Sequence, residues 1–185
     1  MPRPFWPKPA AEEPRNRLLG MTISIITAGR TGPNKALRFG GDASVDAVGR
    51  RDIAALAGEL GQIEVICGPE TAAVESAALL AGTSEIDAAL HTLDVGAWDG
   101  LTPEEIDVSA LREFFTDPYS CPHGGESIVT FVDRIMSWYS ESRDRIGAAH
   151  LVVAMPVAQA LIAGDPAGFL AVQVAPGRRY RAPHR

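Results

Sequence analysis

The stretch Thr22-Ile-Ser-Ile-Ile-Thr-Ala-Gly-Arg-Thr31 decides how the rest of this chain is organised. Its segment Ile23-Ser-Ile-Ile26 is rich in apolar β-branched residues, which is typical of a buried strand. Ala28-Gly29 ends the run and leads into polar residues, so we expect the strand to open into a turn. In an open α/β sheet, ligands bind at the loops that follow the carboxyl ends of the strands. This loop is therefore the first place to look for a functional site.

Strands and helices alternate downstream of this stretch. We predict further strands near residues 63–67, 90–95, 151–154 and 169–174. We predict helices that end before Gly61 and that cover about residues 70–81, 103–115, 126–146 and 156–163. Helix starts are indicated by the capping residues in Asp42-Ala-Ser-Val-Asp46 and by Pro69 in a first turn. The alternation predicts a three-layer α/β/α sandwich with a mostly parallel central sheet.

Composition indicates one globular domain with two tails. The chain has 185 residues, of which 46% are hydrophobic and 22% charged, enough for one domain with a full core. Residues 1–20 hold five prolines without a periodic apolar face, so we expect a flexible tail. We place the domain at 21–177 and a basic C-terminal tail at 178–185. A homodimer is retained as one outcome, with the Phe5-Trp6 segment docked across it.

Charge and cysteine content narrow the class of protein. The net charge is −6, but residues 21–177 hold 9 basic and 21 acidic residues, a balance of −12. An acidic body is a poor surface for nucleic acid. No apolar run approaches membrane-spanning length, and the N-terminus lacks the apolar core of a signal peptide. Cys67 and Cys121 fit neither a disulfide framework nor a metal motif. We expect a reduced cytoplasmic protein without metal or cofactor.

Four motifs occur in the order of one known family. They are Gly29-x-Thr31-x-x-Asn34, Cys67-Gly-Pro69 followed by Ser76-Ala77, Asp94-Val-Gly-Ala-Trp-Asp-Gly-Leu101, and Gly124-Gly-Glu-Ser127. Together with the elements between them, they make residues 22–174 resemble the histidine phosphatase superfamily, which has the phosphoglycerate mutase-like fold. The resemblance implies that fold for this chain.

The resemblance also locates the family's two histidines. In active members the first strand opens into Arg-His-Gly, and this histidine attacks phosphorus; the matching triplet here is Thr27-Ala28-Gly29. Alanine has no nucleophilic atom, so the covalent step is lost. The second histidine falls at Met155, and the following Pro156 also removes a backbone N–H.

Two further family positions are changed as well. The family's arginine on the helix after the second strand falls at Ala72, and its acidic proton donor falls at Thr92. Neither side chain can perform the original task. The resemblance therefore implies a degenerate member without phosphatase or mutase activity by the phosphohistidine route.

The remaining pocket is expected to be neutral and partly apolar. We predict that it is lined by Thr27, Ala28, Arg30, Thr31, Asn34, Arg38, Ala72, Thr92, Met155 and Pro156. The arginines and the asparagine either bind a carboxylate or carbonyl group, or are surface residues that pair with Asp42 or Asp46. The threonine hydroxyls either bind a neutral ligand or satisfy nearby backbone groups. A vestigial pocket, filled by side chains or water, is the other outcome.

Four residues are candidates for residual catalysis. Arg30 lies in the first loop, and Asp94 lies two residues beyond Thr92, on the same face if this segment is a strand. Asp94 either acts as an acid or caps a loop. Cys121-Pro-His123, in the rim loop 116–125, places a nucleophile and a base close in sequence, although no third orienting residue is evident. His91 is expected to point to the opposite face.

Two hypotheses follow for function. In the first, a degenerate histidine-phosphatase-like protein binds a non-phosphorylated small ligand or a protein partner. In the second, the crevice serves a repurposed isomerase, cyclase or lyase that acts on a neutral or carboxylated metabolite. A closed apolar pocket with convergent polar groups favours the enzyme, and a collapsed pocket beside an exposed hydrophobic patch favours the partner-binding module.

Overall fold

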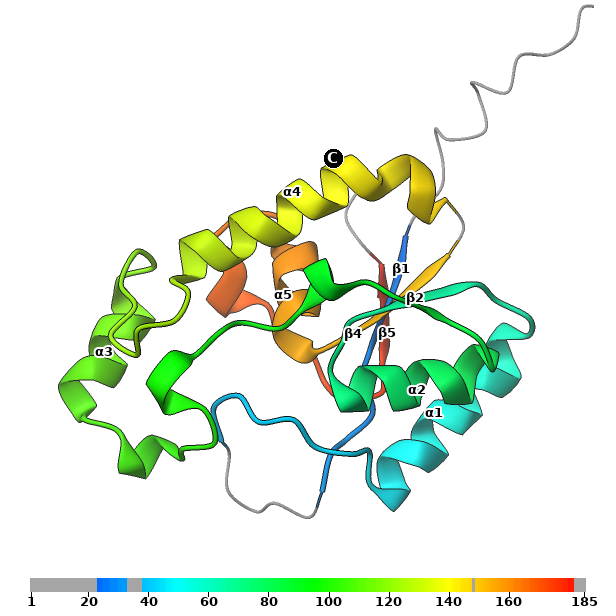
Figure 1. Ribbon diagram of the computed structural model, residues 1–185, viewed down its shortest axis with the longest axis horizontal. Helices are drawn as coiled ribbons and strands as arrows, with labels where there is room; N and C mark the ends of the chain where they lie inside the picture. The colour runs from blue at the N-terminus through cyan, green and yellow to red at the C-terminus, as the bar shows by residue number, and fades with distance from the viewer. Residues whose placement is uncertain (1–22, 33–37, 148, 182–185) are drawn as a thin grey trace, which may run out of the picture.

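The central sheet has five strands in the order β3-β2-β4-β1-β5 (Figure 1). The computed structural model describes residues 23–32, 38–147 and 149–181, so the proline-rich tail and Asn34 lie outside the described residues. The strands are β1 (Ser24–Thr27), β2 (Val65–Cys67), β3 (Glu85–Ile86), β4 (His150–Val153) and β5 (Arg179–Arg181). β1, β2, β3 and β4 pair in parallel, and only β5 is antiparallel. The predicted mostly parallel α/β sandwich is confirmed.

Helices cover both faces of the sheet. α1 (Ala47–Leu60) and α2 (Thr71–Ala81) pack on one face, where Ile53 and Leu80 join Ile26 and Val152 in one core cluster. α4 (Ile128–Ile146) and α5 (Met155–Ala163) cover the other face. Every residue of β1 is buried, as expected for a strand covered on both sides.

Local capping sets where most helices begin. Asp46 accepts the N–H of Gly49 at the start of α1, and Ser127 accepts that of Thr130 at the start of α4. The 103–115 helix is corrected to a 3₁₀ turn, η4 (Pro103–Glu105), followed by α3 (Val108–Thr116), because Asp107 caps a new helix start. Pro69 lies outside α2, since Glu70 is the N-cap residue.

The predicted strand at 90–95 was wrong. This segment follows a 3₁₀ turn, η2 (Ala88–Leu90), and precedes a second one, η3 (Gly96–Trp98), without entering the sheet. Leu90, Leu93 and Val95 are buried in the core beneath α4. Leu93 and Val95 are two positions apart, which resembles the alternation of a half-buried strand although no ladder forms. The third parallel strand is instead the two-residue β3.

The predicted last strand at 169–174 was also wrong. Residues Phe169–Ala171 form a 3₁₀ turn, η5, and the sheet closes with β5, which lies within the segment expected to be a basic tail. Tyr180 anchors β5 to the core: its ring packs against the main apolar cluster, and its hydroxyl accepts the N–H of Ala175. No helix among the described residues is long and apolar enough to span a membrane.

Candidate functional site

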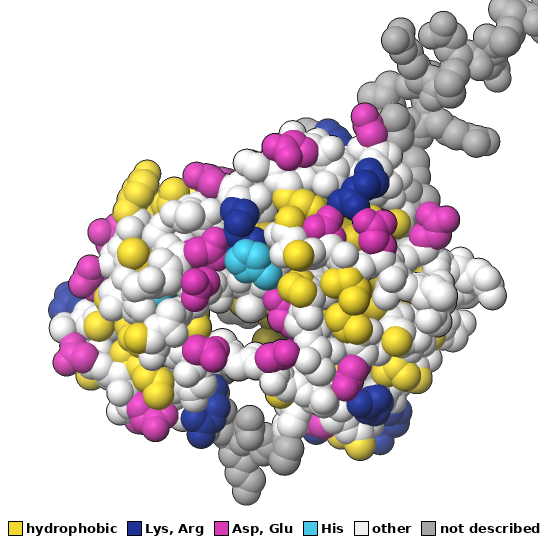
Figure 2. Space-filling view, in the orientation of Figure 1, with side chains coloured by type: hydrophobic (Ala, Val, Ile, Leu, Met, Phe, Trp, Pro, Cys, Tyr) yellow, Lys and Arg dark blue, Asp and Glu magenta, His cyan; other side chains and the backbone are white. Residues whose placement is uncertain are grey.

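The ends of three parallel strands meet at one edge of the sheet. Thr27 pairs with Val153, so Ala28 and Met155 follow neighbouring strands at their carboxyl ends. The N–H of Ala28 donates to the carbonyl of Val153 at 2.8 Å, and that of Gly68 donates to Val152 at 3.0 Å. Figure 2 shows a hollow in this face of the molecule, with acidic side chains on its rim. We take this carboxyl edge as the candidate site.

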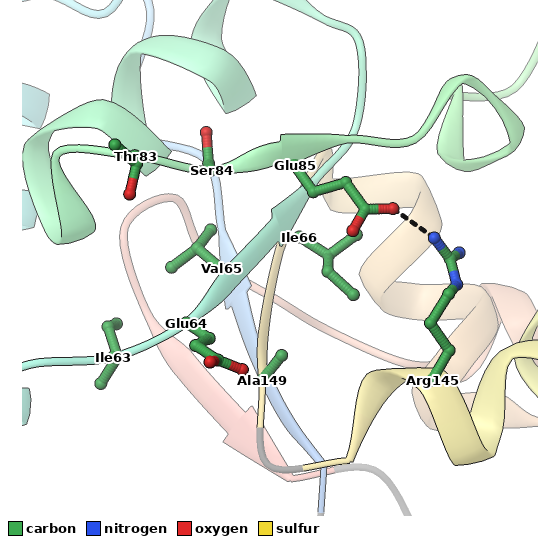
Figure 3. A pocket seen from close by; sticks show the side chains of 9 residues that line it. All are labelled: Ile63, Glu64, Val65, Ile66, Thr83, Ser84, Glu85, Arg145 and Ala149. Carbon is green, nitrogen blue, oxygen red and sulfur yellow. Dashed lines mark hydrogen bonds and ion pairs between the residues drawn. The ribbon is translucent and has the colours of Figure 1, made fainter.

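A second hollow of about 350 Å³ lies at the opposite edge of the sheet (Figure 3). Its lining comes from the start of β2, from β3 and from the end of α4, and Arg145 there forms an ion pair with Glu85. It contains none of the predicted site residues. Because ligands of parallel sheets bind at the carboxyl ends of strands, this opposite hollow is not the candidate site.

The floor of the site at the carboxyl edge is apolar. Ala28 and Ala72, which were predicted to line one pocket, lie in a single buried cluster with Val45 and Ala73. Met155 is the first residue of α5 and is 40% exposed. Pro156 follows it, partly buried, in the first turn of the helix.

The Thr27 hydroxyl binds the backbone of residues 175–178, just before β5, and does not face the crevice. Its hydroxyl donates to the carbonyl of Ala175 at 2.6 Å and accepts the N–H of Arg178 at 2.9 Å. The side chain is fully buried, so this hydroxyl is not available to a ligand in the crevice. Thr31 is exposed and forms a β-bridge with Val45.

The two predicted arginines that the structure describes pair with neighbouring groups. Arg30 Nε donates to Asp46 at 2.7 Å, which is the surface alternative foreseen from the sequence. Asp46 also accepts the N–H of Gly49, and the net effect lowers the pKa of its carboxyl. Arg38 donates to the carbonyl of Gly100 at 2.6 Å and lies 3.8 Å from Glu105.

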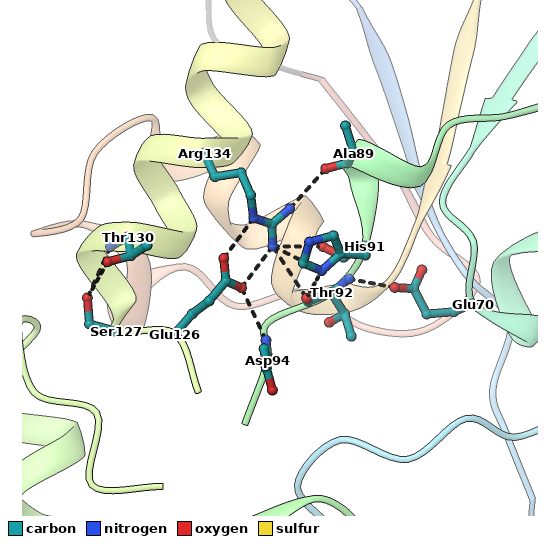
Figure 4. Close-up of polar contacts among 9 residues, drawn as sticks. All are labelled: Glu70, Ala89, His91, Thr92, Asp94, Glu126, Ser127, Thr130 and Arg134. Carbon is teal, nitrogen blue, oxygen red and sulfur yellow. Dashed lines mark hydrogen bonds and ion pairs between the residues drawn. The ribbon is translucent and has the colours of Figure 1, made fainter. Parts of the chain in front are cut away.

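Asp94 lies in the loop between η2 and η3, beside Glu126 (Figure 4). Its carboxylate accepts the N–H of Gly96 at 2.8 Å, and its backbone N–H and C=O both bond Glu126. This geometry is that of a loop-capping aspartate. Desolvation raises the pKa of Glu126, but the hydrogen bonds from Arg134 and from the N–H of Asp94, together with the charge of Arg134, outweigh this effect. The net pKa is lowered, so the carboxylate stays charged.

Cys121 and His123 do not form a nucleophile–base pair. Cys121 is exposed, whereas His123 is 3% exposed and packs edge-on against Trp98 and Phe114. His123 Nδ1 accepts the N–H of Gly125 at 3.0 Å, and Nε2 is buried without a hydrogen-bond partner among the described residues. Burial lowers the pKa of this imidazole, against a smaller opposing effect of Asp94.

Two carboxylates at the start of α2 were not recognised as site residues from the sequence. Asp42 accepts both the N–H and the hydroxyl of Thr71, at 2.8 and 2.7 Å. Glu70 accepts the N–H of Thr92 at 2.5 Å, and its other oxygen is buried without a partner in the described chain. The only available signal was the cap-like run 42–46, which pointed to α1 rather than α2.

Comparisons with known proteins agree with this fold. Residues 23–163 match the family model described as histidine phosphatase superfamily (branch 1). No curated protein sequence matches the chain.

Three solved structures illustrate the shared fold. Mycobacterial glucosyl-3-phosphoglycerate phosphatase complexed with VO3 is 22% identical with a TM-score of 0.74, covering 86% of this chain and 90% of that one. A histidine-to-alanine mutant of phosphoserine phosphatase from Entamoeba histolytica, in complex with phosphoserine, is 17% identical with a TM-score of 0.73, covering 85% and 88%. Phosphoglycerate mutase from Thermus thermophilus is 20% identical with a TM-score of 0.69, covering 89% and 100%.

Proposed function

Because the chain belongs to the histidine phosphatase superfamily, we propose that it is a member that binds a non-phosphorylated ligand in its crevice and does not perform phosphohistidine chemistry. The observation that carries this proposal is the pair of residues at the ends of β1 and β4. Ala28 and Met155 follow neighbouring strands, where the resemblance places the two histidines of active members. Neither side chain can accept a phosphoryl group or stabilise one.

The surrounding charges support the same proposal. Arg30 and Arg38 are engaged by Asp46, Gly100 and Glu105, so neither is a free cation in the described part of the site. A phosphate dianion would therefore meet an apolar floor at Ala28 and Ala72 and an acidic rim. A neutral or singly charged metabolite avoids this desolvation and repulsion.

Binding has to be measured as well as turnover. The Entamoeba relative described above was solved with phosphoserine although a histidine is replaced by alanine. Loss of one histidine in this family is therefore compatible with a bound phosphate ester. For this chain we expect neither hydrolysis of an aryl phosphate nor thermal stabilisation by inorganic phosphate or phosphoserine.

The decisive experiment combines native mass spectrometry with a thermal-shift panel of carboxylate and apolar metabolites. A ligand of the crevice should raise the unfolding midpoint, and Met155→Glu should weaken that shift. Ile86→Glu is the matched control, because Ile86 is apolar and 55% exposed but belongs to β3 at the sheet margin. Aryl phosphate turnover that copurifies with the protein and falls in Met155→Glu, but not in Ile86→Glu, would overturn the proposal. Co-purification of a protein instead of a metabolite would favour the partner-binding form of the same hypothesis.

One observation favours a repurposed enzyme as the second candidate. Glu70 places a fully buried carboxylate oxygen, unpartnered among the described residues, at the start of α2 beside the backbone of Thr92. Such a group can serve as an acid or base in isomerase or lyase chemistry when ligand binding uncovers it, because the oxygen is buried in this structure. Conversion of a panel ligand that stops in Glu70→Gln, while ligand binding persists, would select this candidate.

A further inference from the structure

A short segment joins the two sides of the crevice. Residues 38–46, here called the strap, begin beside the segment that joins η3 and η4 and end at the start of α1. On the way they pass the start of α2 (Figure 1). All residues of the strap belong to the described chain. Its ends are held by backbone bonds, so its position is defined on both sides.

The first attachment is to the η3 side. The N–H of Phe39 donates to the carbonyl of Leu101 at 2.9 Å, and the N–H of Gly100 donates to the carbonyl of Phe39 at 2.8 Å. Gly41 N–H donates to the carboxylate of Asp99 at 2.7 Å. Gly40 has φ +58°, and a Cβ there would lie 2.1 Å from Asp99 Oδ1. Glycine is therefore required where the strap passes Asp99.

The second attachment is to α2, through Asp42. The carboxylate accepts the backbone N–H of Thr71 with one oxygen and the Thr71 hydroxyl with the other. Thr71 is the first residue of this 11-residue helix. The unpaired N–H groups and the dipole at a helix start favour an anion, and here the chain supplies its own.

A second carboxylate occupies the same helix start. Glu70 is the N-cap residue of α2, and its partnered oxygen takes the N–H of Thr92. Its other oxygen is fully buried with no donor among the described residues. An anionic ligand that approached α2 would thus meet two negative groups and find the Thr71 donors already used.

We propose that Asp42 is a specificity-determining residue, which excludes anionic ligands by occupying the start of α2. This inference rests on the proposed function and deepens it, because it names the group that keeps phosphate out of the crevice. The replacement of the family's arginine by Ala72 then has a structural counterpart. In active members the arginine would attract the phosphate of a substrate, whereas in this chain the carboxylate of Asp42 occupies the start of α2.

The experiment measures thermal stabilisation by inorganic phosphate in the full-length protein. Wild type and Asp144→Ala, a control at an exposed position on α4, should show no shift. Asp42→Ala should gain a saturable rise of about 2–4 °C in the unfolding midpoint. Asp42→Asn removes the charge but keeps one acceptor for Thr71 N–H, so it should gain a smaller rise.

Hydrogen exchange at the Thr71 amide makes the result decisive. It should become faster in Asp42→Ala, because its acceptor is removed. Faster exchange without a phosphate shift would show that Asp42 is only a cap, and unchanged exchange would show that another group fills the helix start; either result overturns the inference. A phosphate shift in wild type counts against the proposed function, whereas the difference between wild type and Asp42→Ala tests the role of Asp42.

Discussion

Arg134 holds Glu126 in a two-point ion pair, with Nε 2.8 Å from one carboxylate oxygen and Nη2 2.9 Å from the other (Figure 4). The same guanidinium donates to the carbonyl of Ala89 at 2.9 Å. Glu126 in turn accepts the N–H of Asp94. The pair therefore ties the start of α4 to the segment that follows η2, which forms one wall of the crevice.

Replacing Arg134 should loosen this wall. We expect Arg134→Lys to lower the free energy of unfolding by about 1–3 kcal/mol, since an ammonium cannot make the planar two-point contact. The value is below that for a buried pair because the side chains are 24% and 16% exposed. Urea unfolding measures it, with Arg143→Lys on the exposed side of α4 as control. Equal losses in both variants would contradict the assigned role.

Glu70 should be more important for stability as an acceptor than as a charge. Glu70→Gln keeps an oxygen for the Thr92 N–H and removes the negative charge from a carboxylate whose second oxygen is buried and unpartnered in the described chain, so its stability should equal or exceed that of wild type. Glu70→Ala leaves Thr92 N–H unpaired and should cost about 1–3 kcal/mol. Both are measured by urea unfolding. A larger loss in the glutamine variant than in the alanine variant would refute this assignment.

His123 should make stability decline in mild acid. Burial lowers the pKa of the folded imidazole below its ordinary value, about 6.5. Between that value and the lower folded pKa, the unfolded chain binds a proton that the folded chain does not. The free energy of unfolding therefore falls as pH decreases through this window and levels off below it. Burial, with the charge of Arg179, also lowers the pKa of His150, so it adds a decline of the same sign.

The His123 contribution is isolated by comparing slopes of stability against pH. His123→Phe should flatten the decline below about pH 7 relative to wild type. Urea unfolding at several pH values provides the measurement. A slope in His123→Phe as steep as in wild type would show that the histidine does not titrate differently on folding.

The two thiols should differ sharply in reactivity. Cys121 is exposed, whereas Cys67 is buried and its pKa is raised by burial, against the lowering effect of a hydrogen bond to Ser84. Because the thiolate is the reactive form, iodoacetamide should modify Cys121 in the native protein and Cys67 only in urea. Peptide mass spectrometry identifies the site. Cys121→Ser should abolish native labelling, and persistent labelling at Cys67 would contradict its burial.

Local sequence patterns were sufficient to predict the layered architecture, and they place the candidate site at the carboxyl edge of the sheet. Apolar β-branched runs mark β1, β2 and β4, and helical spacing marks α1, α2, α4 and α5, with side-chain caps at the starts of α1 and α4. These signals are local, because a cap or a buried face depends on residues only a few positions apart. They also placed Ala28 and Met155 at strand ends and Ala72 in α2, where the structure has them.

The contacts that fill this edge, and the short strands at the sheet margins, depend on residues far apart in the chain. β3 and β5 have two and three residues, too few to show a period, and they are strands because neighbours supply their hydrogen bonds. Asp42 meets Thr71 across 29 positions, and Glu70 meets Thr92 across 22. Such pairs form when folding brings distant backbone donors within reach of a carboxylate, and no pattern along the chain encodes which carboxylate arrives.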